Sequence, residues 1–263
     1  MLRLLVLTAT LASLAGCSRQ GSSTPSPAAT DAGTALSQPP ASPSTAQQQQ
    51  GISERARQLH AQGRKHGEKG EFELALRYFH EAEKAAPSWP LPIYDMGLTF
   101  LHMRADDKAL ETFTRLDAVA PLGLPGSKRI LDSLRREKDG RVPEGTLREF
   151  LQIEQLRDVQ EVRRRLQELT KKAPGFVPAW EELAFTEAKP EEAEKLIAKA
   201  LSLEPDAASR GTLLVYKATV MWRRGEADAA RKLLREILAD PTTLPDAAAE
   251  ARELLNIPEG MKP

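Results

Sequence analysis

The chain has 263 residues, of which 37 are basic and 37 acidic, so its formal net charge at neutral pH is zero. A balanced charge excludes the basic footprint of a nucleic-acid binder, and we expect no nucleic-acid partner. Cys17 is the sole cysteine, which excludes an intramolecular disulfide. After residue 16, no uninterrupted apolar run reaches the roughly 18 residues that a membrane-spanning helix needs.

Residues 1–16 have the composition of a secretory signal peptide. A basic residue, Arg3, precedes an apolar run from Leu4 to Leu14, and small residues come just before Cys17. The run is too short to span a membrane. We therefore expect this segment to be removed on export, and it takes no part in the fold.

The end of this leader resembles the lipobox of bacterial lipoproteins, which is a branched apolar residue, a small residue, Gly or Ala, and then Cys. Leu14, Ala15, Gly16 and Cys17 match every position. The resemblance implies cleavage before Cys17 and a diacylglycerol on its sulfur, and several acyl chains hold a protein on a membrane. The alternative is an ordinary secreted protein. By enterobacterial sorting rules, Ser18 favours the outer membrane over the inner, so we expect a lipid-anchored protein of the cell envelope that faces the periplasm.

Residues 17–50 follow as a linker that begins with the lipidated cysteine. Between residues 18 and 50 the chain is rich in Ser, Pro, Ala, Thr and Gln, and its only charges are Arg19 and Asp31. Such a segment cannot bury enough apolar surface to offset its ordering entropy, so we predict that it is disordered.

After residue 50 the sequence becomes charged and rich in Leu and Ala, with helical periodicity and almost no strand signal. Small, aromatic and proline residues recur there with a period of 34. Gly63, Ala75, Phe79 and Pro87 reappear 34 residues later as Gly97, Ala109, Phe113 and Pro121. The pattern predicts an all-α domain built of repeats.

This unit resembles the tetratricopeptide repeat (TPR), which places small residues at positions 8, 20 and 27, aromatics at 11 and 24, and proline at 32. Two regular units fill residues 51–123, and two further units with altered spacing, at about 177–207 and 211–241, fill residues 177–241. Residues 242–263 supply a capping helix, Pro245 to Leu255, and a tail.

Residues 124–176, between these units, are helical but fit the repeat poorly. Phe150 stands where the motif has a small residue, while Asp158 with Glu161 forms a capping box that favours a helix start near Val159. Segment 126–138 is then an extra helix or half of a degenerate unit. The basic residues here could contact anionic lipid or a partner, but interspersed Glu and Asp favour an ordinary solvated surface. They are Arg163, Arg164, Arg165, Lys171 and Lys172, with Lys128, Arg129, Arg135 and Arg136.

The resemblance implies a TPR-type α-solenoid, a right-handed superhelix of antiparallel helix pairs, whose concave groove is lined by the first helix of each pair. Glu181 is one of the positions that map to this groove. The groove residues that we predict to contact a partner are Arg57, His60, Arg64, Tyr94, Leu98, Leu101, Phe185 and Trp222. Aromatic residues at such positions suit an amphipathic helix or an extended peptide, and the alternative is that each packs against an adjacent helix.

Catalytic and metal-binding patterns are absent from the sequence. Its four histidines, His60, His66, His80 and His102, have no cysteine partner and no zinc-site spacing. A nucleophile elbow and a phosphate-binding glycine loop are also missing. We therefore expect no enzyme activity, no cofactor, no metal and no small-molecule substrate.

Two classes of function remain. The first is a lipid-anchored scaffold or adaptor that binds and helps assemble other cell-envelope proteins, with a pilotin-like assembly factor for a type IV pilus or secretion-system secretin as its narrower form. The second is an accessory subunit that tethers or regulates a peptidoglycan enzyme or a periplasmic protease. In either case the lipid on Cys17 supplies location, and the groove supplies specificity.

Overall fold

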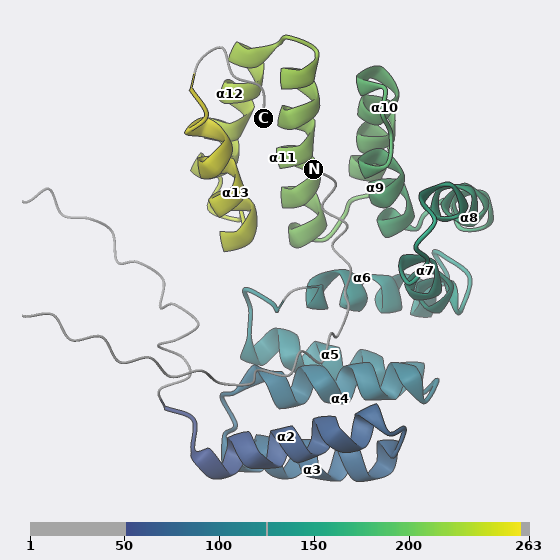
Figure 1. Ribbon diagram of the computed structural model, residues 1–263, viewed down its shortest axis with the longest axis vertical. Coiled ribbons are helices and arrows are strands. Elements are labelled where there is room, and N and C mark those ends of the chain that lie inside the picture. Colours follow the sequence, from purple (N-terminus) through teal and green to yellow (C-terminus); the bar gives the residue numbers. More distant parts are fainter. Residues whose placement is uncertain (1–50, 125, 259–263) are drawn as a thin grey trace, which may run out of the picture. The chain divides into compact units, whose positions relative to one another are not determined.

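The computed structural model describes residues 51–124 and 126–258, which fold into twelve α-helices without a strand (Figure 1). The all-α prediction is confirmed. No helix in these two ranges combines the length and the apolar character needed to cross a membrane. The predicted signal peptide, the lipidation site at Cys17 and the linker lie outside the described residues.

The helices follow one another through short connections, and their labels are those of Figure 1. Their bounds are α2 (Glu54–Glu68), α3 (Phe72–Ala85), α4 (Pro90–His102), α5 (Asp106–Val119), α6 (Ser127–Lys138), α7 (Thr146–Glu154), α8 (Val159–Lys172), α9 (Val177–Phe185), α10 (Pro190–Leu201), α11 (Ala207–Arg223), α12 (Ala227–Ala239) and α13 (Pro245–Leu255).

The helices pack in consecutive pairs in the manner of TPR units. The most extensive contacts join α2 to α3, α4 to α5, α9 to α10, and α11 to α12. The second helix of a pair then contacts the first helix of the next, as α3 does with α4 and α10 with α11. First helices of neighbouring pairs also touch, α2 against α4 and α9 against α11. Each pair thus buries its apolar faces against its neighbours.

Glycine permits a close helix crossing in the first two pairs. A Cβ atom on Gly63 would lie 2.5 Å from the ring of Phe79, and a Cβ on Gly97 would lie 2.7 Å from the ring of Phe113. Both rings are buried. The 34-residue period therefore reflects the same helix crossing in both pairs. In each, an aromatic ring fills the space that a side chain on the glycine would need.

Left-handed residues mark the turns inside three of the pairs. Gly70, two residues after the end of α2, has a φ of 74°, and Gly225, two residues after the end of α11, has a φ of 88°. Arg104, which follows Gly70 by 34 residues, adopts the same conformation at a φ of 57° in the turn between α4 and α5. The second pair thus keeps the left-handed turn although arginine replaces glycine there. A side chain in this region of φ carries a steric cost that glycine avoids.

Regular pairing is interrupted between α6 and α8. Helix α6 packs chiefly on α5 and makes smaller, comparable contacts with α7 and α11. Arg136 of α6 donates from Nη2 to the carbonyl oxygen of Glu204 at 2.7 Å, which ties α6 to the loop before α11. Helix α6 therefore joins two parts of the chain that are far apart in the sequence.

Side-chain caps set three of the helix starts, and at α2 the hydroxyl of Ser53 accepts a hydrogen bond from the N–H of Ala56. Asp158 accepts hydrogen bonds from the N–H groups of Gln160 and Glu161, so α8 begins at Val159. Asp206 caps α11 in the same way, and this helix begins at Ala207, four residues before the predicted start of its unit. The difference arises because a capping aspartate satisfies the first free N–H groups of the helix.

Candidate partner-binding site

The eight residues predicted to contact a partner lie on α2, α4, α9 and α11, which are the first helices of the four extensive pairs. We refer to the surface formed by these four helices as the A-helix face. Because α2 contacts α4 and α9 contacts α11, the predicted residues fall into two groups of neighbouring helices.

In α2, only part of the predicted set is accessible. Arg57 and Arg64 are exposed, and Arg57 pairs with Glu54 at 3.2 Å. His60 is buried, and its Nε2 lies 2.8 Å from Oδ2 of Asp95. The His60 ring also lies edge-on to the ring of Trp89, with centroids 4.8 Å apart. The side chain of His60 therefore joins α2 to α4 and contributes to packing.

Helix α4 contributes a stripe of half-buried apolar side chains. Tyr94, Leu98 and Leu101 pack partly against the main core and keep part of their surface exposed. The Tyr94 ring lies edge-on to Phe113, with centroids 6.0 Å apart. Burial, reinforced by the charge of Asp95, raises the pKa of the Tyr94 phenol to about 12, so this hydroxyl stays protonated and able to donate a hydrogen bond.

The remaining two predicted residues differ in accessibility. Phe185 of α9 is half-buried and lies edge-on to Tyr216 at a centroid distance of 4.7 Å. Trp222 of α11 is buried, and the guanidinium of Arg231 sits over its ring at 4.8 Å. Trp222 therefore takes the packing role that the sequence left open as the alternative.

A group of buried charges, which the sequence analysis did not single out as a site, lies where α6, α7 and α9 meet. Nη2 of Arg129 donates to Oε1 of Glu154 at 2.9 Å, and Nη1 donates to Oε1 of Glu182 at 3.5 Å. Glu181, next to Glu182, is only 4% exposed. The ring of Phe150 lies against the guanidinium at 5.4 Å. We term Arg129, Glu154, Glu181 and Glu182 the Arg129 cluster.

Burial controls the charge state of the Arg129 cluster. It raises the pKa of Glu181 to about 8 and that of Glu154 to about 7, against the pull of Arg129. It also raises the pKa of Glu182. Burial alone would lower the pKa of Arg129, but the surrounding carboxylates, with Glu181 first, raise it. Near neutral pH the Glu181 carboxyl group therefore keeps its proton, while the guanidinium stays charged.

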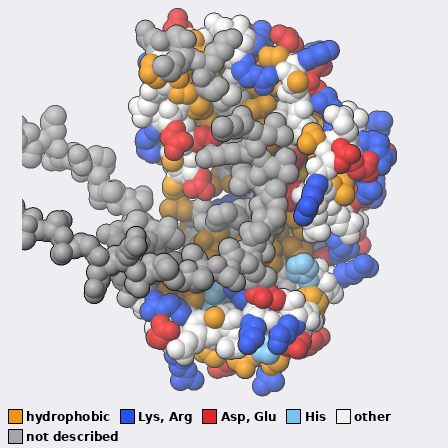
Figure 2. Space-filling view, in the orientation of Figure 1, with side chains coloured by type: hydrophobic (Ala, Val, Ile, Leu, Met, Phe, Trp, Pro, Cys, Tyr) orange, Lys and Arg blue, Asp and Glu red, His pale blue; other side chains and the backbone are white. Residues whose placement is uncertain are grey.

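The prediction of a solvated basic surface is wrong for Arg129 and Arg136. Arg136 is buried and pairs through Nε with Asp132 at 2.6 Å, and the side chain of Arg129 is mostly buried in the cluster. Lys128 pairs with Asp117, and Arg135 is exposed. The difference arises because α7 and α9 bring carboxylates onto Arg129, while Gly175 and Glu204 accept hydrogen bonds from Arg136. Elsewhere, on the face drawn in Figure 2, acidic and basic side chains are interspersed.

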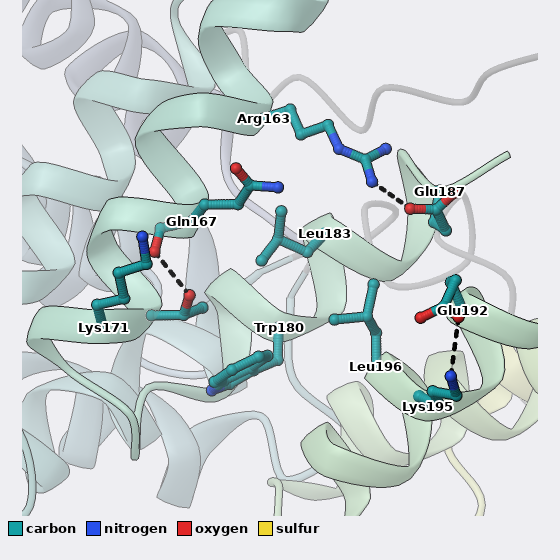
Figure 3. A pocket seen from close by; sticks show the side chains of 10 residues that line it. Arg163, Gln167, Lys171, Trp180, Leu183, Glu187, Glu192, Lys195 and Leu196 are labelled. Carbon is teal, nitrogen blue, oxygen red and sulfur yellow. Dashed lines mark hydrogen bonds and ion pairs between the residues drawn. The ribbon is translucent and has the colours of Figure 1, made fainter. Parts of the chain in front are cut away.

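A cavity of about 370 Å³ lies between α8, α9 and α10 (Figure 3). Trp180, Leu183 and Leu196 form its apolar part, and charged side chains surround them. Most of these charges are paired, Arg163 with Glu187, and Lys195 with Glu192 at 2.8 Å. None of the eight predicted contact residues lines this cavity.

The described ranges 51–124 and 126–258 contain no group of three His, Cys, Asp or Glu side chains placed to hold a metal ion. The histidines instead make pairwise contacts. His66 pairs with Glu71 and stacks on Tyr78 at a centroid distance of 5.1 Å, and His102 stacks on Phe72 at 5.9 Å. These rings pack at the ends of helix pairs.

No protein-family model and no curated protein matches the sequence. Among solved structures, the fold is similar to that of the TPR protein TTC0263 from Thermus thermophilus, with 19% identity, a TM-score of 0.34, and coverage of 76% of this chain and 98% of that one. It is similar to MamA from Desulfovibrio magneticus RS-1 with 15% identity, a TM-score of 0.34, and coverage of 72% and 96%.

A third similar structure is PilW, described as a widely conserved type IV pilus biogenesis factor. It has 15% identity and a TM-score of 0.36, and the match covers 78% of this chain and all of the PilW chain. At these identities and TM-scores the likeness concerns the repeat fold alone.

Proposed function

We propose that the chain is a protein-interaction scaffold, held on a membrane by a lipid at Cys17, that binds other cell-envelope proteins through its A-helix face and helps to assemble them. The observation that carries this proposal is the stripe on α4. Tyr94, Leu98 and Leu101 are spaced i, i+4 and i+7 and so share one side of the helix, where each keeps apolar surface partly exposed. Such a stripe suits the apolar side of a partner helix or an extended peptide.

The same surface carries charged and aromatic side chains that can orient a bound partner. Arg57 and Arg64 supply positive charge on α2, and Phe185 supplies a further half-buried ring on α9. Aromatic and arginine side chains contribute disproportionately to binding energy at protein interfaces. The proposal therefore assigns recognition to Arg57, Arg64, Tyr94, Leu98, Leu101 and Phe185, and leaves the buried His60 and Trp222 to packing.

The lipid anchor makes one prediction. Cells that express the Cys17→Ser variant are expected to release the protein into the soluble periplasmic fraction, because the variant lacks the sulfur that would carry the diacylglycerol. Labelled palmitate should enter the wild-type protein and be missing from the variant. Continued labelling of Cys17→Ser, or its retention in the membrane fraction, would refute the anchor.

Partner binding makes a second prediction. A photo-reactive phenylalanine analogue placed at Leu98 is expected to form covalent adducts with a partner protein on irradiation of intact cells. The same analogue at Glu111, exposed on the second helix of the same pair, is the matched control and should form few adducts. Equal adducts from both positions, or none from Leu98, would contradict the assignment of the A-helix face.

The identity of the adducts separates the forms of this function. A secretin subunit would support a pilotin-like assembly factor. A peptidoglycan enzyme or a periplasmic protease would instead support an accessory subunit that tethers or regulates the enzyme. In either outcome the chain acts by positioning another protein.

A further inference from the structure

The Arg129 cluster holds one cation against three carboxyl groups. Asp206 adds a fourth carboxylate nearby, and its Oδ1 accepts a hydrogen bond from the N–H of Ala208 at the start of α11. The other buried guanidinium of α6 belongs to Arg136, which is already committed to Asp132 and to backbone carbonyl groups. Buried charges are ordinarily paired, and here a single guanidinium faces several carboxyl groups. The cluster therefore has fewer cations than its carboxyl groups could pair with.

One atom of the cluster lacks a hydrogen-bond partner. Oε2 of Glu181 is buried and accepts no hydrogen bond from any residue that the structure describes. A hydrogen bond with the Ser209 side chain lowers the pKa of this carboxyl group, but it does not reach Oε2. Native proteins rarely leave a buried oxygen without a donor, because its desolvation is then uncompensated. The cluster thus lacks a donor as well as a charge.

Part of the cluster is accessible to solvent. The side chains of Arg129, Glu154 and Glu182 remain 14%, 11% and 18% exposed, respectively. Glu181 and Glu182 belong to α9, which is part of the A-helix face. Arg129 is also close enough to Tyr94 of α4 for its charge to act on the pKa of that phenol, so a partner that lies along this face passes near the cluster.

We propose that the Arg129 cluster receives a lysine or arginine side chain of the partner protein, which completes the charge balance and supplies the hydrogen-bond donor that Glu181 lacks. This inference rests on the proposed function of the A-helix face and names the chemistry that the face selects. A cation held by several carboxylates in a mostly buried site forms short, charge-assisted hydrogen bonds, and an uncharged side chain would leave the carboxylates unpaired.

Before a partner binds, protons take the place of the missing cation. The charged groups that act on Glu181 are Arg129 from α6, Glu182 from α9 and Asp206 before α11, and Glu154 from α7 faces the same Arg129 and Glu182. An entering cation favours the ionised carboxylates and so displaces protons. By linkage, binding then releases protons and strengthens as the pH rises from about 6 to about 8.5.

The test uses the full-length lipidated protein in detergent micelles, immobilised and panned with a library of random 12-residue peptides. Enriched peptides are expected to share a lysine or arginine at one aligned position, and changing that residue to glutamine should weaken binding about 10-fold or more. The protein variant Glu154→Gln/Glu182→Gln should lose affinity to a similar extent. Glu191→Gln, an exposed change on α10, is the matched control and should bind as the wild type does.

Proton release gives a readout that a merely structural cluster would not show. Calorimetric titration of the best peptide at pH 7.5, in two buffers of different ionisation enthalpy, should reveal release of roughly half to one proton per peptide, and Glu181→Gln should reduce it. The glutamine variants keep the shape of the side chains and remove carboxyl groups that are costly to bury, so they are expected to remain folded. A thermal melt checks this.

The outcomes separate this inference from the proposal on which it rests. Enriched peptides without an aligned cation, or equal binding by the double glutamine variant, would overturn the cationic site and leave the A-helix face as a binding surface. Failure of the wild-type protein to enrich any peptide would count against both. Buffer-independent heats for the wild type would also overturn the site.

Discussion

Replacement of Arg129 by methionine is expected to lower the free energy of unfolding by about 3 to 5 kcal/mol at pH 8. The change removes the cation that pairs with Glu154 and Glu182 and leaves the carboxyl groups of the cluster buried together. Methionine keeps most of the apolar volume of the side chain, so the loss reports charge more than packing. Urea denaturation followed by circular dichroism measures it.

The expected loss depends on pH in a defined direction. Burial raises the pKa of Glu154 to about 7 and of Glu181 to about 8 in the folded protein, above their ordinary value of 4.5. The folded state therefore binds more protons than the unfolded state between these values, and each group lowers stability as the pH rises from about 4.5 through its folded pKa. At pH 5 both carboxyl groups are neutral, so we expect Arg129→Met to cost less there than at pH 8.

Two further variants test whether the loss arises from charge: one is a control and the other a rescue. Arg135→Met, an exposed change on the same helix, should alter stability by no more than about 0.5 kcal/mol. Adding Glu181→Gln to Arg129→Met should restore part of the loss at pH 8, because one buried carboxylate is then removed. An equal loss at pH 5 and pH 8, without rescue, would show that Arg129 acts through packing and not through charge.

The sequence could predict the helix pairs because their determinants are local and repeated. Gly63 and Phe79 recur as Gly97 and Phe113, and both crossings are built on the same contact of ring and glycine. Residues 124–176 carry no such repeat, and there the local signals were the helical segment 126–138, which corresponds to α6, and the capping pattern at Asp158, which marks the start of α8. The contact of α6 with α11 joins segments about 80 residues apart, and no period in the sequence encodes it.

Packing between helices that are distant in the sequence also explains why the Arg129 cluster was not predicted. Its members come from three helices, and in the sequence each stands among other charges, as Arg129 does beside Lys128. The single signal was the position of Glu181 on the groove side of its helix. A repeat position assigns a residue to a face but does not set its depth, which is why His60 and Trp222 are on the predicted helices and nevertheless buried.

Substitution of Gly97 by alanine is expected to lower the free energy of unfolding by about 1 to 3 kcal/mol, although alanine is the better helix former. The new methyl group would lie 2.7 Å from the ring of Phe113, which is buried and cannot move aside without disturbing the crossing of α4 and α5. Thermal and urea denaturation at pH 7 both measure the loss.

The matched control is Gly67→Ala in α2. A Cβ there would lie 3.9 Å from the Cβ of Ala75, an ordinary contact, so alanine should raise stability by up to about 1 kcal/mol through its helix propensity. The two alanines thus have opposite expected signs, and the sign is set by the distance to the facing helix. Combining Gly97→Ala with Phe113→Leu should cost less than the sum of the two single changes, because the smaller side chain makes room for the methyl group. Additive losses, or a neutral Gly97→Ala, would show that the crossing relaxes freely, and the 34-residue period would then need a cause other than close packing.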